Sequence, residues 1–164
     1  MPRRYAAASA LPKLLVVPGQ VFTAYESGEL VRWGTVSSGA AETATPAGLY
    51  HLNWCATGHV SSVNPGWFMP WYFNYDNGDG RAFHEYDLKG APASHGCIRL
   101  LRRDAQWLFG WGDEWRLDAR GATVIQPGTP VLIVGEYDFA ASPPWRSLSW
   151  LAQPVTLPAS VPAS

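Results

Sequence analysis

Charged side chains, cysteines and long apolar runs are all scarce in this sequence. Only 15% of the 164 residues are charged and the formal net charge is −1, so the chain lacks the basic excess that attracts nucleic acid. Nothing in it approaches the roughly 18 consecutive apolar residues of a transmembrane helix. Its two cysteines, Cys55 and Cys97, cannot build a disulfide framework. We therefore expect neither a nucleic-acid partner nor a transmembrane segment.

Apolar and aromatic residues are abundant instead. Hydrophobic residues make up 47% of the chain and aromatic residues 13%, a composition that excludes intrinsic disorder. The 16 glycines and 14 prolines would interrupt any long helix and argue against a coiled coil. At about 100–200 residues per domain, the length corresponds to one globular domain.

The order of apolar runs and turns predicts a mainly-β fold. Short apolar runs between Gly- and Pro-containing turns predict strands at residues 14–17, 21–25, 30–37, 49–54, 81–86 and 131–134. Leu101, Ala105 and Leu108 recur at helical spacing and predict a helix over residues 101–109. We expect a β-sandwich or barrel with one or two short helices. It occupies residues 13–136, between an N-terminal segment of residues 1–12 and a Pro/Ser-rich extension of residues 137–164.

The N-terminus leaves two cellular locations open. Arg3 and Arg4 precede a weakly apolar stretch that ends at Pro12, and a secretory signal needs a more strongly apolar stretch. Either the protein acts in the cytoplasm, or a signal has been removed from the chain and the protein acts in the periplasm or cell envelope.

The reactive side chains concentrate in residues 83–100. His84, His95, Cys97 and Arg99 lie close together in a chain that has only four histidines. A thiol becomes an effective nucleophile when a nearby base or cation favours its thiolate. If residues 94–98 are extended, His95 and Cys97 share a face, and a strand at residues 83–86 can bring His84 beside Cys97.

Other interpretations of these residues stay open at this point. Free cysteine often packs as a small buried hydrophobe, in which case Cys97 is inert. His84, His95 and Cys97 are also a conceivable zinc site, although a zinc ligand and a nucleophile are rival uses of one sulfur. Trp67 and Trp71 suit a non-catalytic module in which tryptophan rings stack on sugars.

The arrangement of motifs resembles the L,D-transpeptidase family of the YkuD type. That family has a histidine motif followed, after a variable loop, by Ser/Thr-His-Gly-Cys and then an Arg or Asn two residues on. Ser94-His95-Gly96-Cys97-Ile98-Arg99 matches the second motif. Three more segments resemble the family in the same order: Thr45-Pro46-Ala47-Gly48-Leu49-Tyr50, Met69-Pro70-Trp71-Tyr72-Phe73 and Pro127-Gly128-Thr129-Pro130-Val131-Leu132-Ile133. The resemblance covers about residues 14–134.

The resemblance implies a catalytic site that requires no metal and no cofactor, because a thiol and an imidazole supply both the nucleophile and the proton transfer. It makes Cys97 the nucleophile and His84 the general base. The backbone N–H groups of Cys97 and Gly96 are expected to hold the oxyanion, and His95 to line the site.

The expected substrate-binding side chains are Arg99, Ser94, Met69, Trp71 and Tyr72. Arg99 binds a substrate carboxylate or braces the site, a role that suits its planar, bidentate guanidinium. Trp67, Trp71 and Tyr72 lie shortly before His84 in the sequence and are expected to form a wall of the substrate cleft.

The implied reaction is acyl transfer through a thioester, with peptidoglycan stem peptides or muropeptides as partners. An amine acceptor gives a cross-link, which is L,D-transpeptidation, and water trims the stem, which is L,D-carboxypeptidation. The sequence departs from the family at Glu85, where Gly, Ser or Thr usually follows the first histidine. The Glu85 side chain either points away from the thiol or raises the basicity of His84.

Overall fold

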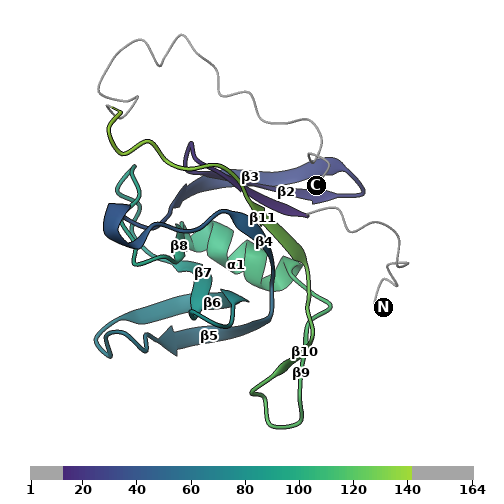
Figure 1. Cartoon of the computed structure of the whole chain (residues 1–164). Helices are drawn as coiled ribbons and strands as arrows, with labels where there is room; N and C mark the ends of the chain where they lie inside the picture. The colour runs from purple at the N-terminus through teal and green to yellow at the C-terminus, as the bar shows by residue number, and fades with distance from the viewer. Residues whose placement is uncertain (1–12, 142–164) are drawn as a thin grey trace.

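Nine strands form one curled sheet around a helix in the computed structural model, which describes residues 13–141 (Figure 1). The predicted N-terminal segment, residues 1–12, and residues 142–164 of the predicted extension lie outside the described residues. The strand order across the sheet is β4-β11-β1-β2-β3-β8-β7-β6-β5. The mainly-β class is therefore confirmed.

Five predicted strands and the predicted helix are present, whereas β6, β8, β9, β10 and most of β5 were not predicted. The strands are β1 (Leu14–Val17), β2 (Val21–Glu26), β3 (Glu29–Ser37), β4 (Gly48–His51), β5 (Trp54–Val60), β6 (Phe68–Asp76), β7 (Arg81–Glu85), β8 (Ile98–Leu100) and β11 (Pro130–Ile133). A short 3-10 turn, η1 (Ala41–Thr43), a two-stranded ribbon of β9 (Arg116–Leu117) and β10 (Val124–Gln126), and the helix α1 (Arg102–Trp111) complete the described chain.

One predicted strand is wrong, because residues 49–54 form the end of β4 and the start of β5. The backbone changes partner between them. The N–H of Leu52 donates to the carbonyl of Thr129, beside β11, whereas the N–H of Asn53 donates to the carbonyl of Asn74 on β6. A segment predicted as one strand therefore crosses from one part of the sheet to another.

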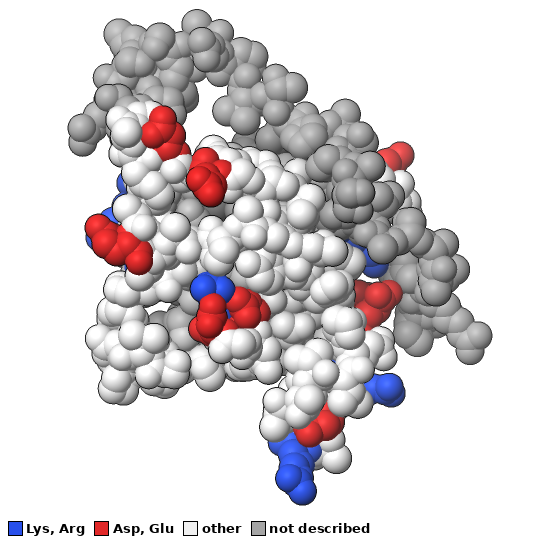
Figure 2. All heavy atoms as spheres, in the orientation of Figure 1, with Lys and Arg blue, Asp and Glu red and all other residues white. Residues whose placement is uncertain are grey.

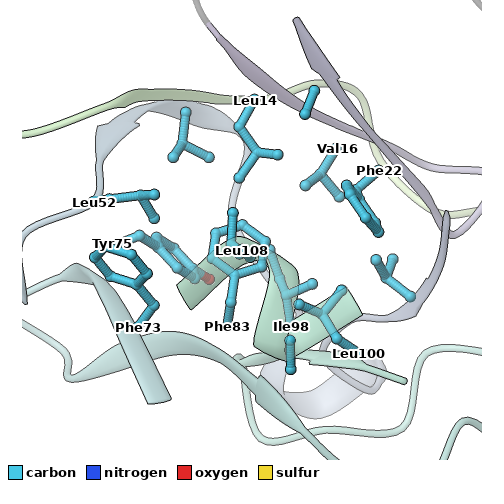
Figure 3. Packing of buried hydrophobic residues seen from close by; sticks show 14 of the residues in the cluster. Leu14, Val16, Phe22, Leu52, Phe73, Tyr75, Phe83, Ile98, Leu100 and Leu108 are labelled. Atoms are coloured by element: carbon cyan, nitrogen blue, oxygen red, sulfur yellow. The ribbon is translucent and has the colours of Figure 1, made fainter. Parts of the chain in front are cut away.

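The curled sheet has two arms, with β1 and β2 in one and β6 and β7 in the other, and the core fills the space between them (Figure 3). Leu14 and Phe22 come from β1 and β2, while Phe73 and Phe83 come from β6 and β7 on the other side. Leu108 of α1 lies between them and is almost completely buried. Burial of a Leu or Phe side chain contributes about 1.5–3 kcal/mol each, so this core holds the two arms in a fixed relation.

Helix α1 is attached to the β2–β3 hairpin by aromatic and charged contacts. Trp107 and Trp111, four residues apart, lie on one helix face, and their rings stack with centroids 5.0 Å apart. The indole N–H of Trp111 donates to Glu26 at 2.8 Å. Arg32 lies over the Trp107 ring and forms a 2.6 Å ion pair with buried Asp104.

Within residues 13–141, no helix is long and apolar enough to cross a membrane.

Strands β7 and β8 bring the two halves of the reactive segment together. They run parallel and adjacent, with Phe83 opposite Ile98 and His84 opposite Arg99. Paired residues in neighbouring strands point to the same face of the sheet, so His84 and Arg99 share one face.

Charged side chains are sparse on the face of the molecule in Figure 2, where uncharged atoms make up most of the described surface.

Candidate active site

A cavity of about 220 Å³ opens where β5, β6 and β7 meet the segment before β8. It contains both the thiol and the first-motif histidine. Its lining residues are Trp54, His59, Ser61, Ser62, Val63, Trp67, Met69, Tyr72, Asn74, Asn77, Asp79, Gly80, Arg81, His84, Tyr86, Ser94, His95, Cys97 and Arg99.

The segment that carries the thiol is a tight bend and does not have the extended backbone considered for residues 94–98. Gly96 has a φ of +105°, a conformation that disfavours any residue with a Cβ, and β8 begins only at Ile98. The hydroxyl of Ser94 donates to the carbonyl of Cys97 at 2.5 Å and accepts from the N–H of Gly96 at 3.1 Å. Ser94 therefore closes the bend from inside, and Cys97 still faces the cavity.

Two further hydroxyls hold the same bend from outside. The carbonyl of Gly96 accepts from Tyr75 at 3.1 Å and from Thr45 at 3.0 Å. Thr45 belongs to the Thr-Pro segment that precedes β4, so this predicted motif has a structural function next to the thiol. Rigid support of this kind is what precise placement of a nucleophile requires.

The hydrogen bonding of the bend corrects one predicted role. The N–H of Gly96 already donates to Ser94, so it is not available to an oxyanion. Of the predicted pair of oxyanion donors, the N–H of Cys97 is the one that remains. Ser94 itself lines the cavity, but its hydroxyl is engaged within the bend and not directed to a ligand.

The Cys97 thiol is half-buried, and opposing effects act on its pKa. Burial raises the pKa above the ordinary value, while the N–H of Ala82, which donates to the sulfur, and the charges of Arg81 and Arg99 lower it. Burial has the largest effect, so the thiol is protonated at neutral pH. It therefore needs a base before it can act as a nucleophile.

His84 lines the same cavity and has the protonation state that a general base needs. It lies on β7, two residues beyond Ala82, and lines the cavity together with the thiol. Burial, with a smaller contribution from the charge of Arg99, lowers the pKa of His84 to about 4. The ring is neutral at pH 7 and can accept a proton.

The backbone after His84 fixes the imidazole. Nδ1 of His84 lies 2.9 Å from the carbonyl oxygen of Glu85, and because a carbonyl only accepts, Nδ1 carries the proton and Nε2 the lone pair. The Glu85 side chain lies on the other face of β7, where its carboxylate is 3.8 Å from Arg102. Of the two expectations for Glu85, the structure has the side chain directed away from the site.

Most other predicted site residues line the cavity. Met69 and Tyr72 are buried in its wall, and burial raises the pKa of Tyr72 to about 12, so its phenol stays neutral. His95 is exposed at the rim, with its ring centroid 4.5 Å from that of Trp67. Arg99 is half-buried and its guanidinium lies 4.5 Å from the centre of the Tyr86 ring.

The structure corrects the prediction for Trp71, which does not line the cavity. Its φ of +52° breaks the alternation of β6, so that Met69 and Tyr72 face the cavity while Trp71 and the next core residues face inward. The Trp71 ring packs edge-on against Phe109 of α1, with centroids 5.3 Å apart. A left-handed tryptophan inside a strand has no sequence signature that would have shown this.

Several lining residues were not predicted at all. Trp54 and His59 come from β5, and their rings lie 4.9 and 4.4 Å from that of Tyr72. No sequence signal marks them, because they reach the cavity through the pairing of β5 with β6, in which His59 lies opposite Met69. Arg81 was also missed, because it was predicted only as the first residue of a strand at residues 81–86. Within residues 13–141, no group of three or more His, Cys, Asp or Glu side chains is placed to hold a metal ion.

Comparison with known proteins gives one consistent family. The model of the YkuD family, described as the L,D-transpeptidase catalytic domain, matches residues 13–133. Among solved structures, the L,D-transpeptidase (Yku) from Stackebrandtia nassauensis is similar, with a TM-score of 0.62 and 23% identity over 79% of this chain and 58% of that one. No curated protein matches the chain.

Two more solved structures show the same fold. An L,D-transpeptidase from Xylanimonas cellulosilytica has a TM-score of 0.59 and 26% identity over 81% of this chain and 65% of that one. L,D-transpeptidase 1 of Mycobacterium tuberculosis has a TM-score of 0.56 and 21% identity over 74% of this chain and 60% of that one. The chain thus matches less than two thirds of the length of each of these proteins.

Proposed function

Since the chain belongs to the YkuD family of L,D-transpeptidase catalytic domains, we propose that it is a cysteine acyl-transfer enzyme that acts on peptidoglycan stem peptides. One observation carries the proposal. Cys97 and His84 line the same cavity, and the hydrogen bond from His84 Nδ1 to the Glu85 carbonyl leaves Nε2 as a proton acceptor. A protonated thiol in the same cavity as a neutral, oriented imidazole corresponds to the resting state of a base-activated nucleophile.

In the first step, the sulfur of Cys97 attacks the carbonyl carbon between an L-centre and the terminal D-residue of the stem. The thiol proton passes to Nε2 of His84, and the N–H of Cys97 donates to the oxyanion. The C–N bond then breaks, His84 returns the proton to the departing amine, and the D-amino acid leaves. The product is a thioester between Cys97 and the shortened stem.

In the second step, an acceptor resolves the thioester. If an amine of a second stem attacks, His84 takes its proton, a new amide bond forms and the thiol is released, which is L,D-transpeptidation. If water attacks, the product is a shortened stem with a free carboxylate, which is L,D-carboxypeptidation. We propose transpeptidation as the principal reaction, and the product distinguishes it from trimming.

Arg99 is proposed to bind the carboxylate of the donor stem. Its side chain lines the cavity on the same sheet face as His84, and no carboxylate in the described part of the chain forms an ion pair with it. Stacking on Tyr86 holds the guanidinium plane while its N–H groups stay free for a planar anion.

We further propose that the enzyme acts in the cell envelope, where such stems are cross-linked.

The test is product analysis with a disaccharide tetrapeptide, with and without a second stem as acceptor. We expect Cys97→Ala to abolish the release of D-alanine. Cys55→Ala is the matched control, because Cys55 packs against the main core and does not line the cavity. Dimers indicate transpeptidation, and a tripeptide alone indicates trimming. Turnover that survives in Cys97→Ala removes Cys97 from the nucleophile role.

A carbapenem gives an independent readout. A thiol activated by His84 is expected to open the β-lactam and retain it as a thioester, which mass spectrometry locates on the peptide that contains Cys97. A non-catalytic module that binds glycans through its tryptophans would leave the mass unchanged. The same measurement on His84→Gln shows whether acylation depends on the imidazole.

A further inference from the structure

Arg81 lies directly against the bend that carries the thiol. It is the first residue of β7, and its side chain lines the cavity together with Cys97. A methyl group built on Gly96 would be 3.3 Å from Nε of Arg81 and 3.6 Å from its Cδ. The Arg81 side chain therefore occupies the space that a side chain at position 96, one residue before Cys97, would need.

Two carboxylates fix this guanidinium in place. One terminal nitrogen of Arg81 is 2.5 Å from Asp76 and the other is 2.6 Å from Asp79. Asp76 also accepts hydrogen bonds from the N–H groups of Gly78 and Asp79, so it folds the turn and holds the arginine with the same carboxylate. The planar fork is thereby held by two partners.

The turn between β6 and β7 thus has a second consequence beyond reversing the chain. Tyr72 donates to the carbonyl of Gly80, which anchors the turn to the cavity wall. Asp76, Asp79 and Arg81 then connect this anchored turn to Gly96. A positive charge is consequently held at a fixed place beside the thiol.

We propose that Arg81 is a positioning residue for the Cys97 nucleophile, which supports the bend at Gly96 and supplies a fixed positive charge that favours the thiolate during attack. Its role in catalysis rests on the proposed function, whereas its effect on the thiol does not. The direction of the effect is supported by the lowering of the pKa of Cys97 by the Arg81 charge.

Other groups face the thiol, and the test has to separate Arg81 from them. Arg99 is the second charge that lowers the pKa of Cys97, and the sulfur also interacts with the phenols of Tyr72 and Tyr75. The remaining titratable groups in the cavity lining are His59, Asp79, His84, Tyr86 and His95. A single substitution at Arg81 leaves all of these in place.

The experiment measures the rate at which iodoacetamide alkylates Cys97 as a function of pH, by mass spectrometry of the Cys97 peptide. Arg81→Met is expected to react about tenfold more slowly at pH 7, because loss of the Arg81 charge lowers the thiolate fraction. Arg81→Gln keeps a hydrogen-bonding group for Asp76, which protects the fold, and is expected to show the same loss. Arg81→Lys keeps the charge and is expected to stay within about threefold of the wild type.

Arg116→Met is the matched control, since Arg116 is exposed on β9 and does not line the cavity. An alkylation profile for Arg81→Gln that coincides with those of the wild type and Arg116→Met overturns the proposal. The readout needs no peptidoglycan, so it is independent of the proposed function. A shifted profile in a protein that never releases D-alanine would reject the function and keep the role of Arg81 at the thiol.

Discussion

Nδ1 of His84 is held 2.9 Å from the backbone oxygen of Glu85, its neighbour in the chain. The bond uses no side chain of Glu85, which explains how a carboxylate at this position coexists with the site. Carbonyl and imidazole belong to consecutive residues of one strand, so the geometry follows from β7 itself. Nε2 is thereby oriented before any substrate enters, and the energetic cost of burying His84 appears in its pH behaviour.

The first prediction concerns stability in acid. The pKa of folded His84 is about 4 and that of an unfolded histidine is about 6.5, so the unfolded chain binds more protons between these values. Stability is therefore fully present above pH 6.5 and is lost as pH falls toward 4, by up to about 3 kcal/mol for this group. Urea unfolding of the wild type and His84→Gln at pH 7 and pH 4.5 checks this.

The difference between the two proteins isolates His84 from the carboxylates, which titrate in both. We expect the wild type to lose more unfolding free energy than His84→Gln over this interval. Equal losses would show that His84 is protonated as readily in the folded protein as in the unfolded chain.

The second prediction concerns the acid limb of the pH–rate profile. The proposed reaction uses neutral His84 as the base, and the lowered pKa keeps the ring neutral well below pH 6.5. We expect kcat/KM for D-alanine release to stay nearly constant down to about pH 5 and to reach half its plateau near pH 4. Stopped assays at ~10 pH values, about 0.5 units apart, measure kcat/KM across this range. A limb near pH 6.5 would indicate a solvated imidazole and contradict the burial of this base.

The third prediction concerns the hydroxyl inside the bend. Ser94→Ala removes both hydrogen bonds that close it and leaves the N–H of Gly96 and the carbonyl of Cys97 without their partner. A buried group that loses its partner costs about 1–3 kcal/mol, and a displaced nucleophile costs roughly ten- to hundredfold in rate. Thermal unfolding and D-alanine release give the two values.

Thr35→Ala provides the comparison for Ser94→Ala, because Thr35 is exposed on β3, away from the cavity lining. It is expected to change the unfolding free energy by less than about 0.5 kcal/mol. If Ser94→Ala behaves like Thr35→Ala in both assays, the bend does not depend on the serine, and its rigidity has to come from Tyr75 and Thr45.

Local sequence patterns predict much of this fold and the chemistry of its thiol segment. Strand and helix positions depend on apolar runs and helical spacing, which are local properties, and five of the six predicted strands are confirmed. The reactive residues are also local, since His95, Cys97 and Arg99 lie within one short segment. The break between β4 and β5 was missed because it reflects a change of hydrogen-bond partner and not a change in apolarity.

The errors in the site have a common physical cause, which is backbone geometry that side-chain pattern does not encode. The left-handed φ of Trp71 shifts which residues of β6 face the cavity, and the positive φ of Gly96 turns an expected strand into a bend. Trp54 and His59 reach the cavity only through the register of the β5–β6 hairpin. Such pairings join residues distant in sequence, so one sequence read alone does not determine them.

The last prediction compares two glycines at which substitution by alanine is expected to have opposite effects on stability. Gly96 has a φ of +105°, and a methyl group there would meet Arg81 at 3.3 Å. Gly96→Ala is therefore expected to lose about 1–3 kcal/mol of unfolding free energy from backbone strain, and to lose activity because the thiol moves with the bend. Gly110 is exposed in α1, and no atom lies within 4 Å of a methyl group built on it.

Gly110→Ala is expected to gain about 0.5–1 kcal/mol, since alanine favours the helix and restricts the unfolded chain. Its rate of D-alanine release should equal that of the wild type, because α1 supports the core and does not line the cavity. Thermal unfolding and the release assay on both variants test the pair. A loss of similar size for both glycines would mean that general packing, and not the left-handed turn before Cys97, sets the requirement at position 96.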